Sequence, residues 1–443
     1  MNRDNFLKTN LKNSILFVLI SLIVITVSFK LMNAKIAFAA LLLILFLPLL
    51  VQNKFVMLNL FLIGYPFLPD MVSIIGAFAI FLVYMADIYI YKREDFRVKS
   101  FYVPVLFAFV FMTINTATSL LVMGSLRDLA MNFAGMCVFF AITVGVKTRN
   151  DLYKVMTSLA ISAALVAFWG IVQFKFFGTV AREWVDADVA NQISARAYSV
   201  FLNPNVFAEY IVLLTPIVVA LFWANKDGFK KFVFLMIVGL LLLSLLLTYS
   251  RGGLLSLGIA ALVFLFFNYR PLIAVAIPLA LFSINFLPES IQNRIFSILN
   301  TKDSSTSYRF KIWDITKEVI KDHPMTGVGF GHKPFKQVFE TYIRSMPIYH
   351  AHNTYLQMMA EGGLAGILTF LFVVIAGIVQ TLRTIYNTTD KKIKTYACGI
   401  LAAIIGILAH GMFEDILYIY RIIITIWIVL ALSTSISHLQ RDE

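Results

Sequence analysis

Charged residues and cysteines are scarce in this chain of 443 residues. Only 14% of the residues are charged, 60% are hydrophobic, and the mean hydropathy is +0.84. A soluble globular chain of this length carries more charge and less apolar sequence. The composition therefore excludes an ordinary soluble domain and predicts an integral membrane protein.

The cysteines and the charge balance further restrict which kinds of membrane protein the chain can be. Cys137 and Cys398 both lie inside apolar runs, which suits small packing residues rather than an extracellular disulfide or a metal site. The formal net charge is +13, but the basic residues form short clusters between apolar runs and not one basic face. Membrane orientation explains this pattern better than nucleic-acid binding does.

Long apolar runs fill most of the sequence. They are about 17 to 25 residues long, the length that a helix needs to cross the hydrocarbon core, whereas barrel strands would be shorter and alternate in polarity. The sequence predicts an all-α, polytopic transmembrane helical bundle of about 12 to 14 spans, forming a single integral membrane domain over residues 1–443. The expected spans are 14–32, 36–51, 55–68, 71–91, 101–123, 128–146, 153–176, 206–224, 232–247, 253–267, 271–287, 355–382, 396–410 and 418–433.

Basic residues predict the orientation of these spans. The first run, 14–32, is too long for a signal-peptide core, so we expect it to remain as the first span. Lysine and arginine in short loops mark the cytoplasmic side, and here every second connection is basic. We therefore expect both termini in the cytoplasm. The connections 177–205, 248–252 and 288–354 are then expected on the outer side.

One long polar segment, residues 289–354, interrupts the apolar runs. Ordering such a loop costs conformational entropy and gains no lipid contact, so we expect it to carry the chemistry. Residues 304–307 can cap a helix over about residues 308–321, with Arg309 in its first turn. The segment ends in His350-Ala351-His352, immediately before a span.

Three arginines share the predicted outer side with His352, namely Arg196, Arg251 and Arg309. Guanidinium groups bind phosphate through paired hydrogen bonds and stay charged at any working pH. Imidazole titrates near pH 6.5 and takes a proton from an attacking hydroxyl. This combination favours transfer from a lipid-linked pyrophosphate. Simpler interpretations stay open, since Arg251 could merely reach water at the membrane surface and residues 203–205 could be a plain helix start.

Two metal sites are alternatives to this chemistry. His350 and His352 could bind zinc, but a His-x-His motif alone lacks a third ligand. Asp186 and Asp188 form a pair of carboxylates of the kind that holds Mg²⁺ or Mn²⁺ on phosphate substrates. We expect neither a metal nor another cofactor.

Five ordered motifs lie between about residues 196 and 366. They are Arg196 with Asn203-Pro204-Asn205, Ser250-Arg251-Gly252, Arg309 with Ile312-Trp313, His323-Pro324 with Gly327-Val328-Gly329, and His352-Asn353 with Tyr355-Leu356. This ordered set resembles the bacterial O-antigen ligase and polymerase superfamily. The resemblance implies a GT-C-like fold and a metal-independent, inverting glycosyltransferase. The implied donor is a glycan on undecaprenyl pyrophosphate, at the outer face of the bacterial cytoplasmic membrane.

The resemblance also implies roles for single residues. His352 is the expected general base on an acceptor hydroxyl, while Arg251 and Arg309 hold the pyrophosphate and stabilise charge on the leaving group. The expected substrate contacts are Arg196, Asn205, His350, Asn353 and Tyr355.

Three functions remain open at this point. A ligase would hand a finished glycan to a glycolipid acceptor, and a polymerase of the same superfamily would join repeat units carried on two lipids. A lipid-linked oligosaccharide flippase is the third. Transporters tend to place charges at the bilayer midplane, whereas most notable charges here lie toward the outer ends of spans. The expected setting is surface polysaccharide biosynthesis.

Overall fold

The computed structural model describes residues 53–90, 100–177, 195–297, 304–346 and 348–441. The chain divides into two compact units, Met1–Leu58 and Asn59–Glu443. Of the first unit only residues 53–58 are described, and they begin the helix α3 (Lys54–Gly64). That one domain covers residues 1–443 stays a prediction. The candidate site lies wholly within the second unit.

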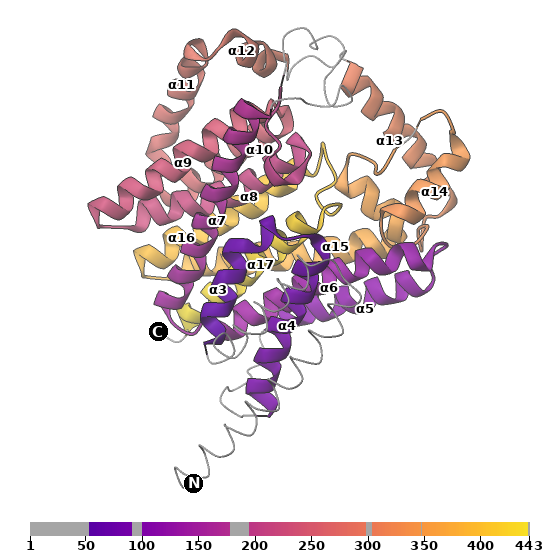
Figure 1. Cartoon of the computed structure of the whole chain (residues 1–443), viewed down its shortest axis with the longest axis horizontal. Helices are drawn as coiled ribbons and strands as arrows, with labels where there is room; N and C mark the ends of the chain where they lie inside the picture. The colour runs from indigo at the N-terminus through magenta and orange to yellow at the C-terminus, as the bar shows by residue number, and fades with distance from the viewer. Residues whose placement is uncertain (1–52, 91–99, 178–194, 298–303, 347, 442–443) are drawn as a thin grey trace, which may run out of the picture. The chain divides into compact units, whose positions relative to one another are not determined.

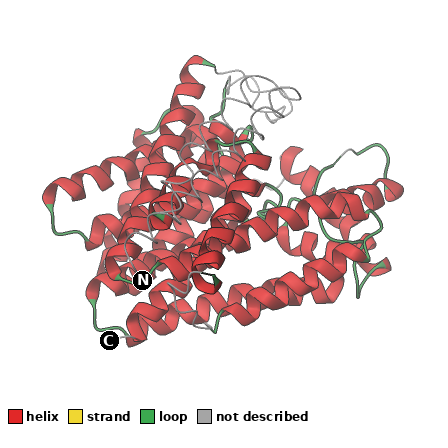
Figure 2. Ribbon diagram, turned by 60° about the horizontal axis from the view of Figure 1, so that its bottom comes forward, coloured by secondary structure: helices red, strands yellow, loops and turns green. Residues whose placement is uncertain are grey.

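The described residues form helices and no strand (Figure 2), which confirms the predicted all-α fold. Within these residues, nine helices are long and apolar enough to cross a membrane. The chain is therefore a polytopic helical membrane protein. The nine are α4 (Asp70–Tyr89), α6 (Val122–Gly145), α7 (Arg149–Phe176), α8 (Pro204–Ala224), α9 (Gly228–Thr248), α10 (Arg251–Asn268), α15 (Thr354–Asn387), α16 (Lys391–His410) and α17 (Tyr420–Arg441).

Three shorter apolar segments also fall where spans were expected. The predicted spans 14–32 and 36–51 lie outside the described residues, and every other predicted span falls on a helix of the structure. The shorter segments are α3 with η1 (Tyr65–Phe67), α5 (Tyr102–Ala117), and the run of η4 (Arg270–Leu272), α11 (Ile273–Ser283) and η5 (Ile284–Phe286).

Side-chain caps set where three of the helices begin. Asn203 caps α8, Ser250 caps α10 and Asn353 caps α15, each by accepting hydrogen bonds from backbone N–H groups of the first turn. Such caps satisfy donors that have no partner inside the helix. The predicted helix start at residues 203–205 is thus confirmed. These caps also fix the positions of Asn205, Arg251 and the histidine before α15.

Close packing holds α16 against α8 and α10 (Figure 1). A Cβ atom added at Gly399 would lie 2.6 Å from the Cβ of Ala220, and one added at Gly406 would lie 2.9 Å from the Cβ of Ala260. Small residues at such crossings let helix backbones approach closely in a membrane. The C-terminal end of α16, and the loop 411–419 that follows it, are therefore held firmly beside the start of α10.

The long polar segment contains three helices: α12 (Glu289–Phe296), α13 (Ser304–Asp322) and α14 (His332–Tyr342). The helix expected over residues 308–321 is present. It starts earlier, at Ser304, so Arg309 lies in the second turn and not in the first as predicted. The reason is that residues 304–307 form the first turn themselves and do not precede it as a cap.

A small apolar core joins α13 and α14 beside α15 (Figure 1). Ile312 and Val319 from α13 and Phe335 and Phe339 from α14 are fully buried in it. Ile312 and Val319 lie seven residues apart, so they belong to one face of α13. The same core includes Ala351, so it holds the backbone that carries the two histidines.

Candidate functional site

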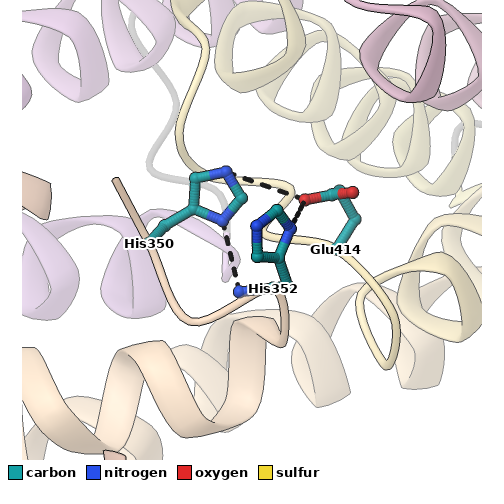
Figure 3. Close-up of side chains that lie close together, drawn as sticks. All are labelled: His350, His352 and Glu414. Carbon is teal, nitrogen blue, oxygen red and sulfur yellow. Dashed lines mark hydrogen bonds and ion pairs between the residues drawn. The ribbon is translucent and has the colours of Figure 1, made fainter. Parts of the chain in front are cut away.

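A buried carboxylate, Glu414, lies at the centre of the site. It is located in the loop between α16 and α17 and is 3% exposed. Its Oε1 is 2.6 Å from Nδ1 of His352 (Figure 3). Its Oε2 accepts a hydrogen bond of 3.1 Å from Nδ2 of Asn205 and lies 3.5 Å from Nη2 of Arg309. Segments far apart in the sequence therefore converge on one carboxylate.

His352 combines a fixed ring with access to solvent. The carboxylate of Glu414 engages Nδ1, which makes Nδ1 the protonated nitrogen and leaves Nε2 as a proton acceptor. Among the described residues, Nε2 has no hydrogen-bond partner. The side chain is 26% exposed, so a substrate hydroxyl can reach it. The backbone of His352 is left-handed, with φ of 50°, a costly conformation for a residue other than glycine.

His350 is a buried neighbour of this ring. The rings of His350 and His352 have centroids 4.3 Å apart, and the backbone N–H of His352 donates to Nδ1 of His350 over 3.2 Å (Figure 3). Burial, and then the neighbouring His352, lowers the pKa of His350 to about 3. His350 is therefore neutral at working pH. It is 6% exposed, which leaves little surface for the predicted substrate contact.

Glu414 is ionised despite its burial. Burial alone would raise the pKa of this carboxyl group, but the interactions with His352, helped by His350 and Arg309, outweigh it, and the net pKa lies well below its usual value. A fixed negative charge thus lies against the imidazole. Such a charge stabilises the imidazolium that forms when the ring takes a proton.

Arg196 and Asn205 connect to the centre as a chain of hydrogen bonds. Arg196 is 6% exposed, and its Nε donates to the backbone oxygen of Thr248 over 2.7 Å. Its Nη2 donates to Oδ1 of Asn205 over 3.2 Å. The Asn205 amide, in turn, donates to Glu414. Both predicted residues are thus brought to the site, where they orient the carboxylate.

Arg251 begins α10, close to the same loop. Its Nη1 donates to the backbone oxygen of Ser297 over 3.2 Å, next to the end of α12. A Cβ atom added at the following residue, Gly252, would lie 3.6 Å from Cε1 of His410 and 3.7 Å from Cβ of Phe413. The start of α10 therefore touches the loop that carries Glu414.

Asn353 and Tyr355 have structural contacts. The Oδ1 of Asn353 caps α15, and its Nδ2 donates to the backbone oxygen of Met412 over 3.1 Å. The hydroxyl of Tyr355 donates to the backbone oxygen of Leu408 over 2.9 Å. These bonds tie the start of α15 to the end of α16. That the two side chains also touch a substrate stays a prediction.

Thr354 links the start of α15 to the loop that carries Glu414. Its N–H donates to the backbone oxygen of Gly411, and its hydroxyl donates to the backbone oxygen of Glu414 while accepting from the N–H of Ile416. Thr354 is fully buried. Thr354 therefore fixes the loop that carries Glu414 against the first turn of α15, two residues after His352.

Glu414 was not among the site residues predicted from the sequence. The available signal was the pair Glu414-Asp415 between two apolar runs, because carboxylates at the edge of a membrane are expensive and usually have a function. The structure also supplies the third ligand that the two histidines lacked. His350, His352 and Glu414 offer ligand atoms within 4.8 Å of one another, so the cluster could hold a zinc ion.

A bound ion would compete with the hydrogen bonds of this cluster. It would displace the proton between Nδ1 of His352 and Oε1 of Glu414, and it would lie near the guanidinium of Arg309. The other predicted metal alternative, Asp186 and Asp188, lies outside the described residues.

Residues 236–371 match the family model described as O-Antigen ligase. The predicted resemblance to the superfamily is thereby confirmed. The matched residues include Arg251, Arg309 and His352. Arg196 and Glu414 lie outside the matched O-antigen ligase residues, so their link to the site comes from the structure.

Two proteins from Rickettsia are similar to part of this chain. One, from Rickettsia conorii, bears the name of a candidate polysaccharide ligase and is 26% identical over 213 residues, or 44% of this chain and 50% of that protein. Another of the same name, from Rickettsia bellii, is 27% identical over 140 residues, or 29% of this chain and 32% of that protein. The chain thus spans half or less of the length of these relatives.

Proposed function

We propose that the chain is a membrane glycosyltransferase of the O-antigen ligase type that acts in surface polysaccharide biosynthesis. It moves a glycan from an undecaprenyl-pyrophosphate donor to the hydroxyl of a glycan or glycolipid acceptor. The site faces the outer side of the bacterial cytoplasmic membrane, and both termini are cytoplasmic. The observation that carries this proposal is the contact of Glu414 with both His352 and Arg309, in a chain whose residues 236–371 match the O-Antigen ligase family model.

In the proposed reaction, Nε2 of His352 takes the proton of the acceptor hydroxyl. The hydroxyl oxygen attacks the anomeric carbon of the donor, and the bond from that carbon to the pyrophosphate oxygen breaks with its electron pair on the oxygen. A single displacement of this kind inverts the configuration. Glu414 stabilises the imidazolium, and general base catalysis contributes about 10² to 10⁴ in rate.

The arginines balance the charge of the leaving group. Arg309 is 22% exposed and uses one edge of its guanidinium for Glu414, so its other N–H groups can bind phosphate. Arg251 is proposed to hold the pyrophosphate from the start of α10. Arg196 remains a proposed donor contact, and its burial adds a second role, that of orienting Asn205. The names of the two relatives favour a ligase over a polymerase.

Substitution of His352 by alanine tests the base. In purified protein reconstituted in lipid, glycan transfer from the lipid-linked donor should be lost, while donor binding and thermal stability stay close to wild type. His323→Ala, in the same polar segment, is the matched control and should keep its activity. Wild-type turnover in a folded His352→Ala variant contradicts the assignment.

Metal independence is tested by chelation. We expect EDTA to leave the transfer rate unchanged, because Arg309 and Glu414 already provide the charges around His352. Activity that is lost and then restored by Zn²⁺ would instead assign a metal to the two histidines. If only Mn²⁺ restored the activity, the carboxylates of Asp186 and Asp188 would be the favoured metal ligands.

A further inference from the structure

A second polar cluster lies next to the histidines, formed by residues that the proposed reaction does not use. Asp128 on α6 binds the start of α14, because its Oδ2 accepts from the backbone N–H of His332 over 3.2 Å and lies 3.0 Å from Nδ1 of the same residue. Glu361 on α15 accepts from the backbone N–H of Gly331 over 2.9 Å. Asp415 adds a third carboxyl group.

These side chains line a small cavity together with Tyr418. Its volume is about 20 Å³, enough for one water molecule or one hydroxyl group. Asp128 is 5% exposed, and its Oδ1 has no hydrogen-bond partner among the described residues. A buried carboxylate oxygen that lacks a partner is unfavourable. The cavity therefore presents an acceptor that a hydroxyl donor would satisfy.

The charge of the cavity decides what kind of ligand fits. Asp128, Glu361 and Asp415 all contribute carboxyl groups, and a pyrophosphate would be repelled by any that are ionised. A neutral hydroxyl group avoids this repulsion and can donate its hydrogen to a carboxylate oxygen, so the cavity suits an acceptor sugar rather than the donor pyrophosphate.

Aromatic rings connect the cavity to the base. The ring of Tyr418 lies edge-on to His332, with centroids 5.3 Å apart, and 4.6 Å from the ring of His350. The His350 ring in turn contacts His352. Further out, Tyr349 is 61% exposed. Sugar rings pack their C–H groups on aromatic faces, whose π-systems carry partial negative charge.

We propose that Asp128, His332, Glu361, Asp415 and Tyr418, which we call the acidic pocket, form the subsite for the terminal sugar of the acceptor. One sugar hydroxyl binds Oδ1 of Asp128, the ring packs on Tyr418, and another hydroxyl reaches His352. This inference rests on the proposed function, because only a glycosyltransferase needs an acceptor site beside its base.

Binding of simple sugars tests the acidic pocket without the donor. The probes are methyl α-glucoside, methyl α-galactoside and methyl N-acetyl-α-glucosaminide, added to the full chain in lipid nanodiscs and followed by saturation-transfer NMR. Asp128→Asn keeps the shape of the side chain but weakens the acceptor. Tyr418→Ala removes the ring, whereas Tyr418→Phe keeps it. Asp314→Asn, on an exposed aspartate of α13, is the matched control.

At least one glycoside should bind the wild type and inhibit glycan transfer. Its affinity should fall about ten-fold in Asp128→Asn, since a neutral amide oxygen accepts a weaker hydrogen bond than a carboxylate oxygen does. Tyr418→Ala should show a similar fall, with Tyr418→Phe and Asp314→Asn near wild type. The Tyr418 pair keeps the test valid if Asp128→Asn does not fold.

Two results overturn the acidic pocket: no glycoside binds the wild type, or binding is unchanged in both Asp128→Asn and Tyr418→Ala. These results differ from a failure of the proposed function. In that case glycosides would bind through the acidic pocket while the wild type transferred no glycan.

Discussion

Replacing Glu414 by glutamine tests the centre of the site. The substitution keeps the size of the side chain and removes its negative charge. In the structure Oε1 of Glu414 is 2.6 Å from Nδ1 of His352, and Glu414 is 3% exposed, so solvent screens the pair weakly. An imidazolium next to glutamine therefore loses the attraction that it has next to the carboxylate.

The expected effect follows from the size of this attraction. Two unit charges about 4 Å apart attract by about 4 kcal/mol at an effective dielectric constant of about 20. Because about 1.4 kcal/mol corresponds to a factor of ten in rate, kcat should fall roughly 10² to 10³-fold. The attraction develops as the ring takes its proton, so the loss should appear in kcat rather than in KM for the donor.

The assay is the initial rate of glycan transfer by protein reconstituted in lipid, at several donor concentrations. Glu414→Asp, which keeps the charge on a shorter side chain, should lose less activity than Glu414→Gln. Glu318→Gln is the control, since Glu318 pairs with Lys321 on an exposed face of α13. A folded Glu414→Gln variant with turnover within about two-fold of wild type would show that the charge of Glu414 does not assist proton transfer to His352.

Two further predictions concern stability and can be checked by thermal unfolding. Thr354→Val removes the hydroxyl that bridges Glu414 and Ile416, and with about 1 kcal/mol for each lost hydrogen bond the variant should unfold at a lower temperature and transfer glycan more slowly. The pKa of Asp415 is raised by burial and then by Glu414 to about 7, so the folded state holds a proton that the unfolded state has released above about pH 4. Stability then falls as the pH rises between these values, and Asp415→Asn should gain more in Tm over wild type at pH 8 than at pH 4. An equal gain at both pH values would contradict the assignment for Asp415.

The helices of this protein were predictable because the length of an apolar run is a local property. Each described span coincides with a run that the sequence alone picked out, including the short segment around Pro271 and the long helix α15. The shift at α13 has a local cause as well. Serine and threonine suit both the residue before a helix and its first turn, so the pattern could not place the start at Ser304.

The site was predictable only in part. His352 and Arg309 were predicted from their residue types and their shared outer side, and Asn205 from the resemblance to the superfamily. The structure brings all three to one place. The role of Asn353 was ambiguous, because an asparagine before a span suits both a helix cap and a ligand contact. Glu414 was missed because its contacts depend on how α16 packs, and no local pattern reports that packing.

The proposed reaction needs two ligands of different charge at one base. A pyrophosphate is anionic and an acceptor hydroxyl is neutral, so each is best bound by groups that disfavour the other. Around His352, the contacts through Glu414 lead to guanidinium groups, whereas those through His350 and Tyr418 lead to carboxyl groups. If both proposals hold, variants of Arg309 should impair use of the donor and those of the acidic pocket should impair use of the acceptor. His352 contacts Glu414 on the donor side and His350 on the acceptor side. Its variants should therefore lower kcat, which is common to both substrates.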